Sequence, residues 1–141
     1  MLIVYLYISL AFICCGAAAV HGGWEGRLAG ALIMAVILAG RVVGSVDLEL
    51  ATSPWFKLWL DGALLVAFVA IMLVSRRWWP IWIVGLQGNG VLAHLSAILI
   101  PEHTPVIYRV LESFWGVPMV LVMAAGVMMD HAAHRSAHSR T

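Results

Sequence analysis

The chain has 141 residues, of which 63% are hydrophobic and 11% are charged, and its formal net charge is +1. A soluble domain carries about 25% charged residues, and a chain of this size has too small a core to bury so much apolar surface. The composition therefore excludes a soluble globular domain, and the near-neutral charge gives no reason to expect nucleic-acid binding.

Apolar runs separated by short polar loops follow one another along the chain. At ~1.5 Å per residue, roughly 20 residues cross a ~30 Å hydrocarbon core. The first run is not preceded by Lys or Arg, so we expect a true span and not a signal peptide. We predict an all-α integral membrane protein: a single transmembrane domain over 1–130 with short loops, then a polar cytoplasmic tail over 131–141. The five predicted spans are 2–20, 28–46, 57–75, 81–100 and 106–129, and a four-span bundle is the alternative.

The loop charges predict the orientation of the bundle. With five spans, one side carries most of the basic residues, while the other side carries acidic loops and Lys57 at its edge. By the positive-inside rule we expect the N-terminus outside and the C-terminus in the cytoplasm of a bacterial inner (plasma) membrane. Four spans would break this alternation. The basic side holds Arg27, Arg76, Arg77, Arg135 and Arg140, and the acidic side holds Asp47, Glu49 and Glu102.

Tryptophans cluster near the ends of the predicted spans, where an indole ring favours the membrane interface. We therefore interpret them as an anchoring belt with no catalytic role. Trp24, Trp78, Trp79 and Trp82 are expected at the inner boundary, and Trp55 and Trp59 at the outer one.

Ionisable residues from four predicted helices fall at nearly one depth, on the outer side. They are Arg41, Asp61, His94, Arg109 and Glu112. Charges inside a membrane are costly, so we expect the two arginines to pair with the two carboxylates, with His94 as a neutral or switchable partner. Two interpretations stay open. Charges near helix ends also reach to the headgroups, and the same layer would suit a chamber for a proton, an ion or a small polar solute.

The fourth predicted helix is polar on two opposed faces. Gln87 and His94 are seven residues apart and share one face, while Asn89 and Ser96 form a second stripe roughly opposite. A helix of this kind is not expected to face lipid on either side. We expect a central position, or one against another chain, with these residues acting either as polar glue between packed helices or as the lining of a pore.

Glycine spacings in the second predicted helix favour close helix contact. They are Gly26-x-x-x-Gly30 and Gly40-x-x-x-Gly44. The expected partners are the lipid bilayer and either further copies of the chain or other membrane subunits.

The sequence contains no complete cofactor or metal site and no catalytic motif. His131, His134 and His138 would share a face of a helix, but no fourth zinc ligand accompanies them. Haem needs two facing intramembrane histidines, and only His94 lies clearly inside a span. No serine–histidine pair, HExxH motif or paired catalytic aspartates appear at usable spacing. We therefore predict no cofactor, no metal and no enzymatic activity.

Two functional hypotheses follow from this pattern. The first is a non-enzymatic accessory or structural subunit of a membrane complex or homo-oligomer, which the short loops and the two-sided polarity of the fourth helix favour. The alternative is a transporter or channel unit for protons, ions or a small polar solute, which the outer charge layer favours.

Overall fold

The protein is all-helical. The computed structural model describes the backbone of residues 2–99 and 105–138, and within these the side chains of 5–99 and 114–136. The helices are α1 (Leu2–His21), α2 (Trp24–Val46), α3 (Leu48–Thr52), α4 (Pro54–Val74), α5 (Trp79–Leu99) and α6 (Pro105–His138). Within the described residues, four helical segments are long and apolar enough to cross a membrane: Trp24–Val46, Pro54–Val74, Trp79–Leu99 and Phe114–Ser136. This confirms the predicted all-α class and is consistent with a helical membrane bundle.

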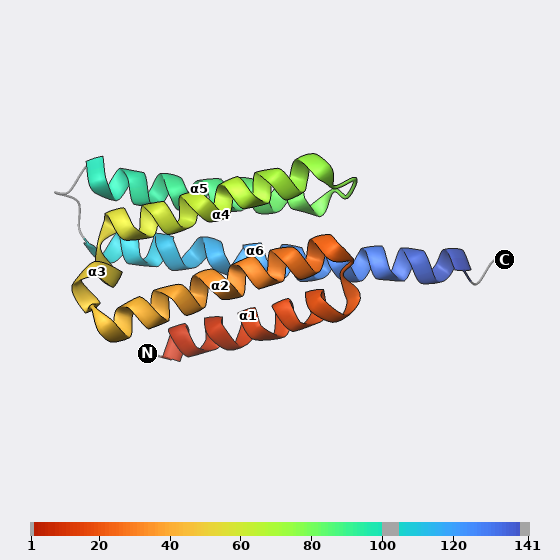
Figure 1. Cartoon of the computed structure of the whole chain (residues 1–141), viewed down its shortest axis with the longest axis horizontal. Coiled ribbons are helices and arrows are strands. Elements are labelled where there is room, and N and C mark those ends of the chain that lie inside the picture. Colours follow the sequence, from red (N-terminus) through yellow and green to blue (C-terminus); the bar gives the residue numbers. More distant parts are fainter. Residues whose placement is uncertain (1, 100–104, 139–141) are drawn as a thin grey trace.

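The five long helices run alternately up and down (Figure 1). One end of the bundle, the α3 end, holds α3 and the first turns of α1, α4 and α6. The opposite end, the Arg77 end, holds the α1–α2 turn and the α4–α5 junction, where Arg77 lies. Helix α6 continues beyond the other helices at the Arg77 end (Figure 1).

The long helices close a ring. Helix α1 packs against α2, α2 against α4, α4 against α5, α5 against α6, and α6 back against α1. The α2–α4 contact is the least extensive of the five. A closed ring of helices leaves a central space, which side chains must either fill or line.

The helices begin and end where the local sequence requires it. A side chain at Gly22 would come within 2.9 Å of the Gly26 Cα, so the α1–α2 turn has room only for glycine. The Asp47 carboxylate accepts a hydrogen bond from the Leu50 backbone N–H at 2.9 Å and caps α3. Pro54 begins α4, where a missing N–H costs nothing.

The first predicted glycine pair brings α1 and α2 together within this chain. A Cβ at Gly26 would lie 3.2 Å from the Ala18 carbonyl oxygen, and one at Gly30 would lie 3.4 Å from that of Cys15. Gly40, in the second pair, has open space around it. The Gly26–Gly30 spacing thus serves packing inside the chain and leaves no reason to assign it to an oligomer contact.

Among the side chains that the structure describes, the buried apolar core lies in the half of the ring toward the Arg77 end. Helices α1, α2, α4 and α5 contribute residues mostly from their halves on that side, and α6 contributes residues from its middle, so the core is a plug about two to three turns deep. Its members are Ala11, Cys14, Cys15, Ala18, Ala29, Ile33, Leu64, Phe68, Ile71, Trp79, Ile83, Met119, Val120, Met123 and Val127.

Trp79 departs from the predicted anchoring belt. It is 1% exposed and lies in the core, whereas Trp24, Trp78 and Trp82 are exposed as expected. Gly126 of α6 makes room for it, because a Cβ there would lie 2.6 Å from the Trp79 Cγ. The expectation was wrong for Trp79 because depth in the membrane does not tell which way a side chain faces.

The residues expected as a polar tail continue the last helix. Helix α6 runs without a break through Asp130 to His138, past the predicted span end at 129. Residues 139–141 lie outside the described part of the chain.

Candidate functional site: a polar cavity at the α3 end

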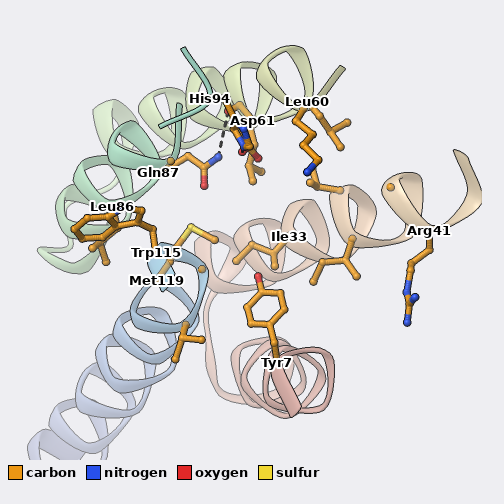
Figure 2. A pocket seen from close by; sticks show the side chains of 18 of the residues that line it. Tyr7, Ile33, Arg41, Leu60, Asp61, Leu86, Gln87, His94, Trp115 and Met119 are labelled. Carbon is orange, nitrogen blue, oxygen red and sulfur yellow. Dashed lines mark hydrogen bonds and ion pairs between the residues drawn. The ribbon is translucent and has the colours of Figure 1, made fainter. Parts of the chain in front are cut away.

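A cavity of about 860 Å³ occupies the half of the ring that the core leaves unfilled. Its lining residues on three helices lie between positions 33 and 41 of α2, 56 and 64 of α4, and 86 and 94 of α5. At ~1.5 Å per residue, each of these stretches covers roughly 12 Å along its helix. Because all six helices contribute lining residues, the cavity is a feature of the whole ring (Figure 2).

An aspartate–histidine pair is the central polar feature of the cavity. The His94 Nε2 of α5 lies 2.9 Å from the Asp61 Oδ2 of α4, and the two side chains are 7% and 25% exposed. At this distance the Nε2–H group donates a hydrogen bond to the carboxylate, in the neutral as in the doubly protonated ring. The pair therefore holds an exchangeable proton at a buried position that borders the cavity.

Gln87 links the same two helices, α4 and α5, about two helical turns nearer the Arg77 end than His94. Its Nε2 donates a hydrogen bond to the Asp61 backbone carbonyl oxygen at 3.2 Å, and the residue is buried. Gln87 and His94 both reach Asp61, which confirms that the two residues share a face. Figure 2 shows both side chains directed toward α4.

Helices α1 and α6 line the opposite wall with residues that sequence reasoning missed. The Tyr7 hydroxyl points from α1 into the cavity, and the Trp115 and Met119 side chains come from α6 (Figure 2). The Tyr7 ring lies over Gly116, where a Cβ would come within 2.9 Å of the hydroxyl oxygen. A tyrosine inside an apolar run gives no sequence signal of this role, since tyrosines also anchor helix ends.

Arg41 and Lys57 line the cavity toward the α3 end. Arg41 is exposed, and in Figure 2 its guanidinium lies apart from the Asp61–His94 pair. The expected Arg41–Asp61 pairing is thus not what the structure forms, because His94 takes the carboxylate. The side chains of Arg109 and Glu112, the other two members of the predicted layer, lie outside the described residues.

The second polar stripe of α5 faces away from the cavity. Asn89 is exposed on the outer surface of the ring, opposite Gln87. The Ser96 hydroxyl donates to the Leu92 carbonyl oxygen of its own helix at 2.8 Å. Of the predicted stripe residues, Gln87 belongs to the cavity, Ser96 is satisfied locally and Asn89 is directed outward.

A second charged cluster closes the Arg77 end. The Arg77 Nη1 donates to the Asp130 Oδ2 of α6 at 2.8 Å, and its Nε lies 3.6 Å from the Glu25 Oε1 of α2. Sequence reasoning placed Arg77 on the basic side of the membrane but did not pair it with Glu25 or Asp130, which lie near the same boundary in the sequence. Their common depth and opposite charges were a usable signal.

Of the α6 histidines, the structure describes the side chains of His131 and His134. The His131 ring contacts the His21 ring of α1, with centroids 4.8 Å apart. Among the described residues, no group of three or more His, Cys, Asp or Glu side chains has the arrangement that a metal ion needs. His138 is the last residue of α6, and its side chain lies outside the described part of the chain.

None of the known protein families, curated proteins or solved structures compared with this chain matches it. The functional argument therefore depends on the site itself. Chemically, the cavity offers a buried proton donor and acceptor pair, a tyrosine hydroxyl, two cationic side chains toward one end and a largely apolar wall.

Proposed function

We propose that the protein binds a small solute in this cavity, as a unit of membrane transport, with Asp61 and His94 as the proton-responsive element of the site. The observation that carries the proposal is the Asp61–His94 pair, held 2.9 Å apart on the wall of a cavity of about 860 Å³. A volume of this size is typical of small-molecule sites. Ionisable residues inside membrane helices commonly mark substrate or proton pathways.

The part of the ring outside the cavity favours a closed vestibule over an open channel. Between the cavity and the Arg77 end lies the apolar plug that contains Phe68, Trp79 and Met123. At the Arg77 end, Arg77 links α2, the α4–α5 junction and α6. A solute therefore enters from the α3 end, and passage to the other side requires the plug to rearrange.

We place the protein in the membrane with all five long helices crossing it. Helix α1 is Leu2–His21 and packs in the same ring as its neighbours, which supports a fifth crossing. The α3 end, with Asp47 and Glu49, faces outward in this proposal, and the Arg77 end, with Arg76 and Arg77, faces the cytoplasm. The cavity then lies in the outer half of a bacterial inner membrane.

Removing either member of the pair should abolish solute binding. Binding to the folded protein adds about 2.7 kcal/mol of stability when the ligand is at 100 times its Kd. Melting can be followed with a thiol-reactive dye, because Cys14 and Cys15 are free and buried. In a panel of alkali cations, amino acids, amines, carboxylates and alcohols, at least one class should stabilise the wild type and not Asp61→Asn or His94→Ala.

The matched control is Ser96→Ala on α5, which removes a hydroxyl that serves only its own helix. This variant should respond to the same compounds as the wild type. If the panel stabilises the wild type and both cavity variants equally, or stabilises none of them, the pair is not a binding site and the proposal is wrong.

Asn89 favours a second candidate function, that of an assembling subunit. It is an exposed amide in the middle of α5, a helix long and apolar enough to cross the membrane. In hydrocarbon such a group gains from a partner that can both donate and accept hydrogen bonds. A second copy of the chain would supply Asn89 at the same depth.

Asn89→Leu should therefore shift the particle toward monomer, while Asn89→Gln, which keeps the amide, should retain the assembly. Native mass spectrometry after gentle extraction measures both. A wild type that is already monomeric, or an oligomer that is insensitive to Asn89→Leu, would remove this candidate.

A further inference from the structure

We infer that the Tyr7 hydroxyl is a second binding group of the cavity and donates a hydrogen bond to an oxygen atom of a small organic solute. This inference rests on the proposed function, because it adds a binding residue and a ligand class to the same site. It does not require a charge on the solute, because hydroxyl, carbonyl and carboxylate oxygens can all accept such a bond.

Tyr7 and the Asp61–His94 pair lie on opposite walls of the cavity. Helix α1, which carries Tyr7, packs against α2 and α6, whereas Asp61 and His94 belong to α4 and α5. Tyr7 and Asp61 lie roughly 8 and 11 Å along their helices from the α3 end, so they are at similar levels. In Figure 2 the Tyr7 hydroxyl is directed into the cavity. A solute in the cavity can therefore contact the hydroxyl and the pair from opposite sides.

The Tyr7 hydroxyl is available to a ligand. It forms no hydrogen bond with any side chain or backbone group that the structure describes. A buried phenol usually has a hydrogen-bond partner, and a hydroxyl without one in an apolar setting costs free energy. Because a phenol is protonated at neutral pH, Tyr7 can donate to an acceptor atom of a bound molecule.

Gly116 of α6 determines where the Tyr7 ring lies. A Cβ at Gly116 would lie 2.9 Å from the hydroxyl oxygen and 3.1 Å from the ring atoms Cε2 and Cζ. A larger residue at this position would therefore displace the ring from its place against α6. A binding group that is positioned before the ligand arrives loses less conformational freedom on binding.

The walls of the cavity favour an organic solute over a bare metal ion. A cation site brings several oxygen atoms to one point. Here Tyr7 and Asp61 present their oxygens from opposite walls, and much of the lining between them is apolar, including Ile33, Leu86 and Met119. An apolar body with an oxygen atom directed at Tyr7 matches this arrangement.

The direct test is fluorine NMR of the full chain in nanodiscs, with meta-fluorotyrosine in place of tyrosine. The chain has three tyrosines, so single substitutions by phenylalanine assign the signals. Cyclohexanol, cyclohexanone and cyclohexanecarboxylate are probes with an oxygen acceptor, whereas cyclohexylammonium and methylcyclohexane have none. At least one oxygen probe should shift the Tyr7 signal saturably and leave the Tyr5 signal unchanged. The two probes without an acceptor should not shift the Tyr7 signal.

Two pairs of variants locate the hydrogen bond, with affinities taken from the dependence of the melting temperature on probe concentration. Tyr7→Phe keeps the ring and removes the hydroxyl, so it should weaken binding of the oxygen probe about threefold to tenfold. Tyr5→Phe is the control, because Tyr5 is exposed on the same helix and does not line the cavity. Gly116→Ala should also weaken binding, because it displaces the ring. Gly85→Ala, which has open space around the new methyl group, should not.

The outcomes separate this inference from the proposed function. Equal affinity of the wild type and Tyr7→Phe for the oxygen probe overturns the role of Tyr7 and leaves the Asp61–His94 pair as the binding site. Equal shifts of the Tyr7 signal with cyclohexylammonium or methylcyclohexane overturn the requirement for an oxygen acceptor. No shift with any probe overturns the inference as a whole, and the proposed function then depends on the melting panel alone.

Discussion

Replacing Arg77 by methionine should destabilise the folded bundle by about 1–3 kcal/mol. The guanidinium is the shared partner of Glu25 and Asp130, whose side chains are 10% and 21% exposed. Removing one member of a buried ion pair leaves an uncompensated charge, which costs about 3–5 kcal/mol when burial is complete. Partial exposure of this cluster reduces the expected loss. The measurement is thermal unfolding in mild detergent, followed by the reaction of Cys14 and Cys15 with a thiol dye.

The adjacent arginine supplies the matched control. Arg76 is exposed, so Arg76→Met should change the melting temperature little although it removes the same charge from the same junction. Adding Glu25→Gln and Asp130→Asn to Arg77→Met should recover part of the loss, because both orphaned charges are then neutral. Equal losses for Arg76→Met and Arg77→Met would show that net charge at this end, and not the three-residue cluster, stabilises the bundle.

The helices themselves could be predicted from sequence because a membrane allows few alternatives. Backbone groups in hydrocarbon must bond within their own segment, so an apolar run of sufficient length becomes a helix. The expected span 57–75 corresponds to α4 at Pro54–Val74, and 81–100 corresponds to α5 at Trp79–Leu99. The differences lie at the ends, where Pro54 and Trp79 begin helices earlier than hydrophobicity alone indicates.

The cavity could be predicted only in part. The position of a residue in the sequence gives its depth in the membrane, but it does not tell which neighbouring helix its side chain faces. Asp61 and His94 were correctly placed at one level, and the seven-residue spacing correctly put Gln87 on the face of His94. The partner of Asp61 was not evident, since Arg41 stood at a similar depth on another helix. Which helix faces which follows from the closed ring, and the ring depends on packing between segments far apart in sequence.

Trp79 and Gly126 illustrate the same limit at the other end of the bundle. The sequence places Trp79 beside Trp78 and Trp82, and the interfacial preference of indole applies to all three. Only the close approach of α6 at Gly126 turns Trp79 into a core residue. Gly126 lies 47 positions from Trp79 along the chain. Because glycine is common in membrane helices, its presence there does not indicate that contact.

Gly126→Ala should therefore destabilise the protein, although alanine is the better helix former by about 1 kcal/mol. The added Cβ would lie 2.6 Å from the Trp79 Cγ and 2.9 Å from its Cδ1, too close for carbon atoms in contact. The atoms that it meets are the ones nearest the α5 backbone, so rotation of the indole cannot relieve the contact and the helices must separate. Overpacking of this kind costs about 1–3 kcal/mol.

Gly85→Ala provides the comparison, because a Cβ at Gly85 meets nothing within 4 Å. It should leave the unfolding temperature unchanged or raise it slightly, as helix propensity predicts. Gly126→Ala combined with Trp79→Phe should stay destabilised, because phenylalanine keeps the Cβ and Cγ that the new methyl group meets. Full recovery in that double variant would place the conflict at the outer part of the indole instead, and the α5–α6 contact would then be set by ring size and not by the approach of the two backbones.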